Sequence, residues 1–141
     1  MWLRQMYHLM ELRKNQWLKP SEIQEIQRKR LRAIIAYAYH NIAFYHERFK
    51  AVGVKPDDLR TIEDLPKLPI TTKSEVREGF RRGTILRKGL DLSKCKLGTT
   101  SGSSGEPLTV VYDGKAEDFQ KAVAVRSYME AGGRFHYKWV M

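Results

Sequence analysis

The chain has 141 residues, of which 42% are hydrophobic, and its formal net charge is +10 at pH 7. This composition predicts a globular protein and excludes a disordered chain, while the charge suits an anionic small molecule, a nucleic acid or an anionic membrane surface as partner. The single cysteine, Cys95, excludes an internal disulfide and a metal site built on several cysteines, and it is typical of the reducing cytosol.

Neither a targeting segment nor a membrane span is expected. The first ten residues include Arg4, Gln5 and His8, so they lack the apolar run of a signal peptide. The longest apolar stretch, residues 31–39, contains Arg32 and is too short to cross a bilayer. We therefore expect a cytoplasmic protein.

Residues 1–90 are predicted to form an N-terminal helical segment. Apolar side chains recur at helical spacing within residues 1–19, and again close to one helical face from residue 23 to residue 49. Pro20 and Ser21 are expected to open the second helix, with Ser21 and Gln24 as a capping box. Gly53 is expected to end this helical region as the C′ residue.

Further helix starts follow in the same segment. Residues 55–58 are predicted as a turn, and Thr61 with Asp64 is expected to cap a short helix that prolines interrupt. Thr72 with Glu75 forms a third capping pattern, which predicts a helix to about residue 80.

Residues 91–141 change in character and predict the beginning of an α/β domain. Residues 95–112 have the pattern of a strand, a loop and a strand, and a helix of about 115–131 follows. Residues 137–141 resemble half a strand without partners, so we interpret the chain as part of a longer protein, incomplete at its C-terminus.

The loop Thr99–Pro107 carries the strongest functional signal. Hydroxyl residues and glycines alternate in it, and a proline closes it. A concave array of N–H groups and hydroxyls binds polyphosphate, and glycine allows the backbone to approach the ligand closely. The candidate ATP-phosphate-binding residues are Thr100, Ser101, Gly102, Ser103, Ser104 and Gly105.

Three other interpretations of this loop are weaker. A flexible linker is disfavoured because residues 108–112, β-branched and aromatic, predict a strand directly after it. A P-loop needs a lysine where Glu106 stands. A dinucleotide-binding fingerprint needs a glycine where Thr100 stands.

Several motifs in the same order resemble one protein family. They are RKRLR at 28–32, AYAYHNIAFY at 36–45, LPKLPITTK at 65–73 and then the loop. From about residue 25 onward the chain resembles the adenylate-forming (AMP-forming ligase) superfamily, in its branch of phenylacetate–CoA ligases, coenzyme F390 synthetases and CapK-like capsular polysaccharide proteins. Residues 106–113 lean toward the CapK-like members. Ala43 replaces a proline of many members, and Leu108 replaces a lysine that this branch often lacks.

The resemblance implies a mixed-sheet adenylate-forming fold and a two-step reaction. ATP and a small-molecule carboxylate form an acyl-adenylate, and the acyl group passes to coenzyme A. In the F390 branch a nucleotidyl group goes to a deazaflavin instead. The loop would hold the β- and γ-phosphates through the N–H groups of residues 102–105 and the neighbouring hydroxyls.

The same resemblance places other parts of the ATP site beyond residue 141. These are the adenine pocket, the ribose-binding acidic residue, the Mg²⁺ ligand and the lysine that promotes adenylation. We therefore expect the chain to be inactive alone and to depend on the rest of the enzyme or on a self-associating partner.

Two alternative functions involve no catalysis: a basic nucleic-acid-binding module and a protein-interaction domain. Basic clusters at 28–32, 81–82, 87–88 and 94–96 are compatible with nucleic-acid binding. Most of the aromatic residues of the chain, however, lie in predicted helical segments, and no nucleic-acid-binding motif is present, so no specific nucleic acid is expected. The four histidines lack metal-ligand spacing, Cys95 is predicted as a core thiol, and the carboxylate pairs 57–58 and 117–118 are predicted as capping groups.

Overall fold

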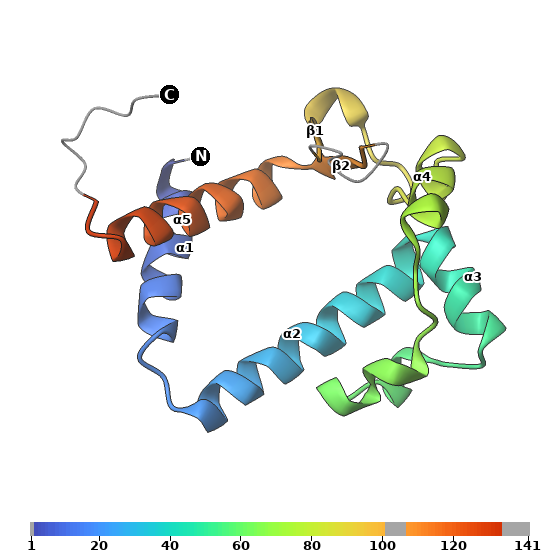
Figure 1. Cartoon of the computed structure of the whole chain (residues 1–141), viewed down its shortest axis with the longest axis horizontal. Coiled ribbons are helices and arrows are strands. Elements are labelled where there is room, and N and C mark those ends of the chain that lie inside the picture. Colours follow the sequence, from blue (N-terminus) through green and yellow to red (C-terminus); the bar gives the residue numbers. More distant parts are fainter. Residues whose placement is uncertain (1, 101–106, 134–141) are drawn as a thin grey trace.

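The chain folds mostly into helices, and one short β-hairpin lies at an edge of the molecule (Figure 1). The computed structural model describes residues 2–100 and 107–133. The elements are α1 (Trp2–Asn15), α2 (Pro20–Asn41), α3 (Ala43–Ala51), η1 (Pro56–Asp58), η2 (Ile62–Lys67), α4 (Lys73–Arg81), η3 (Leu92–Lys94), β1 (Lys96–Thr99), β2 (Thr109–Tyr112) and α5 (Gly114–Glu130). The predicted order, a helical segment followed by the start of a sheet, is confirmed. In the described part of the chain, no helix is long and apolar enough to span a membrane.

The start of α2 differs from the predicted capping box. Lys19 is the N-cap and Pro20 is the first helical residue. The Glu22 carboxylate accepts the Lys19 N–H at 2.8 Å, so Glu22 takes the role that we predicted for Gln24. The reason is Pro20, whose fixed φ suits the first helical position and whose missing N–H costs nothing there.

The helical region that we predicted up to residue 49 is interrupted at Ile42. Ile42 is extended, with φ −127° and ψ 107°, and α3 begins after it. The Phe44 N–H donates to the Thr84 carbonyl at 3.0 Å, so a distant segment accepts one of the first N–H groups of α3. Since both helices face the same core, their shared apolar periodicity conceals the break.

The end of α3 is as predicted. Gly53 has φ +69°, in the left-handed region that favours glycine. Its N–H donates to the Lys50 carbonyl and that of Val54 to the Phe49 carbonyl, both at 3.0 Å. This is the Schellman arrangement, which turns the chain back toward α2.

The principal core lies where α2, α3 and the segment after them meet. It consists of buried Ile35, Phe49, Val54 and Leu59, and half-buried apolar side chains surround it. Leu59 is fully buried at 0% exposure, and it lies in a short connection rather than in a regular helix. This core therefore fixes the chain between α3 and α4.

A second packing centre joins α1 to α5. Asp118 of α5 is only 2% exposed, and its carboxylate accepts hydrogen bonds from Arg4 Nε and Gln5 Nε2 of α1, both at 2.7 Å. The Gln5 hydrogen bond, followed by the charge of Arg4, holds the pKa of Asp118 below its usual value despite burial. The prediction that Asp118 is a capping group is thus wrong, because this carboxylate links two helices.

The division of the chain into an N-terminal helical segment, residues 1–90, and the beginning of an α/β domain, residues 91–141, stays a prediction.

Arg48 of α3 connects the principal core to α4. Its guanidinium pairs with the Glu75 carboxylate at 2.6 Å, donates to the Ile70 carbonyl at 2.6 Å and lies 5.3 Å from the centroid of the Phe44 ring. The predicted box is present, since the Thr72 N–H donates to Glu75 at 2.7 Å and the Glu75 N–H donates back to the Thr72 hydroxyl at 3.3 Å. One carboxylate therefore both caps α4 and ties it to α3.

We predict that Leu59→Ala lowers the free energy of unfolding by about 2–5 kcal/mol, because it leaves a cavity in the core. Leu92→Ala is the matched control, since Leu92 is 43% exposed. Urea unfolding followed by circular dichroism measures both. Equal effects of the two substitutions would show that Leu59 is not part of the stabilising core.

We also predict an acid-dependent loss of stability that involves Glu75. The Thr72 N–H, and then Arg48, lower the pKa of this carboxyl to about 2. Because the folded pKa lies below the unfolded value, the stabilisation is complete above about pH 4.5 and is lost as the pH falls toward 2. The melting temperature, measured between pH 6 and pH 2, should therefore fall less steeply in Glu75→Gln than in the unsubstituted chain. Parallel falls in the two proteins would contradict this.

Candidate functional site: the hairpin and the face of α4 beside it

The hairpin holds both ends of the predicted phosphate loop in a fixed frame. Strands β1 and β2 are antiparallel, with Thr99 opposite Thr109 as the last pair. One step beyond this pair, the Thr100 N–H donates to the Leu108 carbonyl at 3.0 Å. The predicted residues Ser101, Gly102, Ser103, Ser104 and Gly105 lie outside the described residues, so their role stays a prediction.

Thr100 has a local role that the sequence did not indicate. Its hydroxyl oxygen accepts the Leu108 N–H at 2.9 Å, so its side chain closes the base of the loop. The hydroxyl hydrogen is still available for donation, because an oxygen that accepts one bond can also donate one. Thr100 therefore supports the loop directly, whatever else its hydroxyl contacts.

The hairpin formed by β1 and β2, the strands that flank the loop, is joined directly to α5 on one side. A Cβ on Gly98 would stand 3.1 Å from the Tyr112 ring, so glycine allows that ring to lie across the hairpin. Directly after β2, the Asp113 carboxylate accepts the N–H groups of Lys115 at 3.0 Å and Ala116 at 2.8 Å. Asp113 thus caps α5 and sets the direction in which the chain leaves the hairpin.

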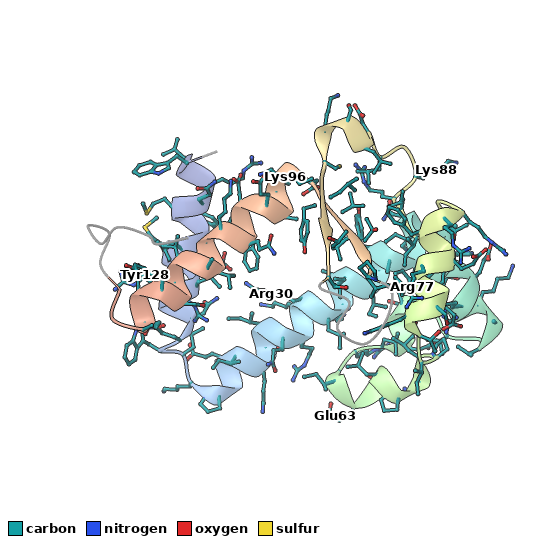
Figure 2. The ribbon with its side chains drawn as sticks, turned by 45° about the horizontal axis from the view of Figure 1, so that its top comes forward. Arg30, Glu63, Arg77, Lys88, Lys96 and Tyr128 are labelled. Carbon is teal, nitrogen blue, oxygen red and sulfur yellow. The ribbon has the colours of Figure 1, made fainter. Side chains whose placement is uncertain are left out.

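On the other side, α4 lies next to the C-terminal end of the loop. A hollow of about 210 Å³ is lined by Val76, Arg77, Phe80, Arg81, Pro107, Leu108 and Thr109. Figure 2 labels Arg77 on the side of α4 that faces the hairpin. Sequence reasoning missed this proximity, although the four-residue spacing of Lys73, Arg77 and Arg81 places three cations along one helical face.

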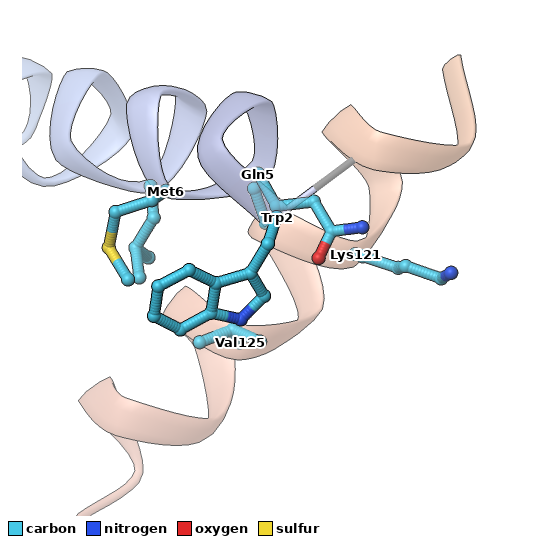
Figure 3. Close-up of a pocket in the computed structure, with 7 residues that line it drawn as sticks. Trp2, Gln5, Met6, Lys121 and Val125 are labelled. Carbon is cyan, nitrogen blue, oxygen red and sulfur yellow. The ribbon is translucent and has the colours of Figure 1, made fainter. Parts of the chain in front are cut away.

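A different hollow lies between α1 and α5, beside their contact (Figure 3). It measures about 260 Å³ and has an apolar lining that includes Trp2, Met6 and Val125. The Gln5 amide at its edge is bound to Asp118. Neither β1 nor β2 contributes to its described lining residues.

The remaining predicted residues have structural surroundings. Cys95 is half-buried and its thiol contacts the Asp91 carbonyl at 3.4 Å, so the prediction of a core thiol is wrong. The reason is its position in an exposed connection directly before β1. Asp58 accepts the Lys55 N–H at 2.8 Å, as a capping group does. Within residues 2–100 and 107–133, no three metal-ligating side chains gather to hold an ion.

We predict that Thr100→Val weakens the closure of the loop, because valine keeps the shape but cannot accept the Leu108 N–H. Amide hydrogen exchange at Leu108 should become about 2- to 13-fold faster, which corresponds to a hydrogen bond of about 0.5–1.5 kcal/mol. Thr100→Ser keeps the acceptor and is the control. Unchanged exchange at Leu108 in Thr100→Val would exclude this role.

The chain is similar in sequence to several curated proteins. No family model matches the chain. Phenylacetate–coenzyme A ligase of Escherichia coli is 34% identical over 113 residues, which are 79% of this chain and 25% of that protein. The Thermus thermophilus phenylacetate–coenzyme A ligase is 29% identical over 117 residues, or 83% of this chain and 26% of that protein. The chain thus spans about a quarter of the length of these curated relatives.

Solved structures show the same fold. A 2-hydroxyisobutyryl-CoA ligase in complex with 2-HIB-AMP and CoA superposes with a TM-score of 0.56 and 23% identity, covering 71% of this chain and 22% of that one. The same enzyme in its postadenylation state with 2-HIB-AMP gives 0.54 and 22% identity over 65% and 20%. From its sequence relatives and its fold, the chain is a segment of the adenylate-forming ligase superfamily, in the phenylacetate–CoA ligase branch.

Proposed function

We propose that this chain is the part of an AMP-forming carboxylate–CoA ligase that holds the phosphates of ATP in the loop Thr99–Pro107. The observation that carries the proposal is the hairpin, which fixes both ends of a glycine- and hydroxyl-rich segment through Thr100 and Leu108. The relatives support it, since they are named phenylacetate–coenzyme A ligases, and one solved neighbour holds an acyl-adenylate together with CoA.

In the proposed reaction, a carboxylate oxygen attacks the α-phosphorus of ATP, and pyrophosphate leaves. The CoA thiolate then attacks the acyl carbon, the acyl–phosphate bond breaks, and AMP leaves. Negative charge grows on the departing pyrophosphate in the first step, so N–H and hydroxyl donors fixed around it stabilise the transition state. The loop residues 100–105 are the proposed donors, and the hairpin keeps their ends in place.

Other components come from outside the described residues. Mg²⁺ is expected with ATP, but the described part of the chain gathers no ligand set for it, so its ligands are proposed to lie elsewhere in the enzyme. The carboxylate substrate is a small organic acid, and the necessary partner is the remainder of the ligase. A cytoplasmic location is proposed, as the single cysteine suggests.

The structure adds little to the nucleic-acid alternative. Several residues of the basic clusters are paired with carboxylates: Arg28 with Glu25 at 2.9 Å, Arg30 with Glu11 at 2.9 Å and Arg82 with Glu78 at 2.5 Å. The aromatic side chains Tyr39, Tyr45 and Phe49 pack in or against the principal core. Neither group forms an exposed surface of stacked rings and unpaired cations.

We predict that Gly102→Val and Gly105→Val strongly impair adenylate formation, because a branched side chain restricts φ and fills the space beside the phosphates. Ser103→Ala and Ser104→Ala should each slow it by about 2- to 13-fold, the effect of one neutral hydrogen bond of about 0.5–1.5 kcal/mol. The measurement is carboxylate-dependent exchange of labelled pyrophosphate into ATP.

A suitable host is the Escherichia coli relative with this chain in place of its matched segment, and the unsubstituted hybrid is the reference. Exchange that is unchanged in both glycine variants would falsify the assignment of the phosphates to this loop. A second reference is Leu92→Ala in the same hybrid, since Leu92 is exposed and lies outside the loop.

A further inference from the structure

The charged residues of α4 are distributed unequally between its two neighbours. Toward α3, a hollow is lined by the carboxylates of Glu47, Glu75 and Glu78 together with Arg81 and Arg82. Toward the hairpin, the hollow beside Pro107 and Leu108 contains Arg77 and Arg81, and no carboxylate lies among its described lining residues. The cationic face of α4 is therefore the one that adjoins the predicted phosphate loop.

The walls of this second hollow suit an anion. Val76, Phe80, Pro107 and Leu108 are apolar, and the Thr109 side chain is the polar contribution of β2. An apolar surrounding strengthens the attraction between a guanidinium and an anion, because fewer water molecules screen the charges. Arginine also matches phosphate geometrically, since its planar fork donates two parallel hydrogen bonds.

The helix that carries these arginines is rigidly held. Its first turn is capped by Thr72 and tied to Arg48 through Glu75. A Cβ on Gly79 would lie 3.0 Å from Phe44 Cδ2, so α4 and α3 are in close contact near the C-terminal end of α4. Charges on such an element are already oriented before a ligand arrives, which is the requirement for electrostatic stabilisation of a transition state.

We propose that Arg77 and Arg81 form a second, cationic wall of the phosphate site and bind the pyrophosphate that leaves ATP. This inference rests on the proposed function, which it deepens by assigning the charge. The candidate donors of the loop, residues 100–105, carry no charge; Glu106 after them is acidic, and Leu108 is apolar. The α4 arginines supply the positive charge from a segment that precedes the loop by about twenty residues.

The two arginines should contribute unequally. Arg77 is half-buried in the hollow. The Arg81 side chain is 74% exposed, so solvent screens its attraction to a ligand more strongly than that of half-buried Arg77. The larger effect is therefore assigned to Arg77.

The test is calorimetric titration of the 141-residue chain with inorganic pyrophosphate and with ATP. Arg77→Gln should weaken pyrophosphate binding by about tenfold, as expected for one charge-assisted contact. Arg77→Lys should recover part of this loss, and Arg81→Gln should weaken binding by about twofold to threefold. Arg13→Gln is the matched control, because it removes the same charge from an exposed position on α1, away from α4 (Figure 1).

Gly102→Val, measured in the same way, separates this inference from the proposed function. If Gly102→Val and Arg77→Gln both weaken binding and Arg13→Gln does not, both are supported. If only Gly102→Val weakens it, the loop assignment stands and the α4 inference is overturned. If only the α4 variants weaken it, the α4 site stands and the loop assignment fails. If the unsubstituted chain does not bind pyrophosphate, both are overturned.

Circular dichroism of each variant checks its fold. Should Arg77→Gln not fold, Arg81→Gln decides in its place, because its side chain is exposed and its loss leaves no buried cavity. Arg81→Gln that binds pyrophosphate as Arg13→Gln does would then overturn the inference.

Discussion

The arrangement around the hairpin depends on the Arg48–Glu75 ion pair. Arg48 belongs to the helix that carries Phe49 into the principal core, and Glu75 belongs to the helix that borders the hairpin. Without this contact, α4 would be joined to α3 mainly by the close approach of Gly79 to Phe44. The Arg48 side chain is 21% exposed and that of Glu75 is 39% exposed, so solvent reaches the pair from the Glu75 side and screens it in part. The position of α4, and of any charge on it, thus follows from α3.

Local signals predicted local structure well. The Thr72 box, the left-handed Gly53 and the two strands on either side of the loop are confirmed. Each depends on residues close in the sequence, since even Lys96 and Tyr112 of the hairpin pair over a short separation. Predictions that required distant partners were less successful. The position of Asp118 near a helix start predicts a capping role. Its actual partners, Arg4 and Gln5, lie more than a hundred positions earlier in the chain, so no local pattern indicates them. The sequence also does not predict the break at Ile42, where the Phe44 N–H donates to the carbonyl of the distant Thr84.

The candidate site shows the same division. The loop was recognised as a motif from its own residues, whereas its closure by Thr100 and the neighbourhood of α4 depend on tertiary structure. A basic stripe on a helix is usually a solvated face, so the spacing of Arg77 and Arg81 in the sequence does not single them out. What distinguishes them is the hollow that they share with Pro107 and Leu108.

The structure shows where the positive charges of the chain lie relative to the hairpin. The net charge of +10 does not by itself identify a partner, and several basic residues are paired with carboxylates on the surface. Toward α3, the α4 carboxylates Glu75 and Glu78 lie together with Arg81 and Arg82. The hollow beside the hairpin, by contrast, contains Arg77 and Arg81 and no carboxylate among its described lining residues. Hydrogen-bond donors orient a phosphate, and cations raise its affinity. A hairpin that supplies the donors and a rigid helix that supplies the cations can therefore separate these two requirements between elements distant in the sequence.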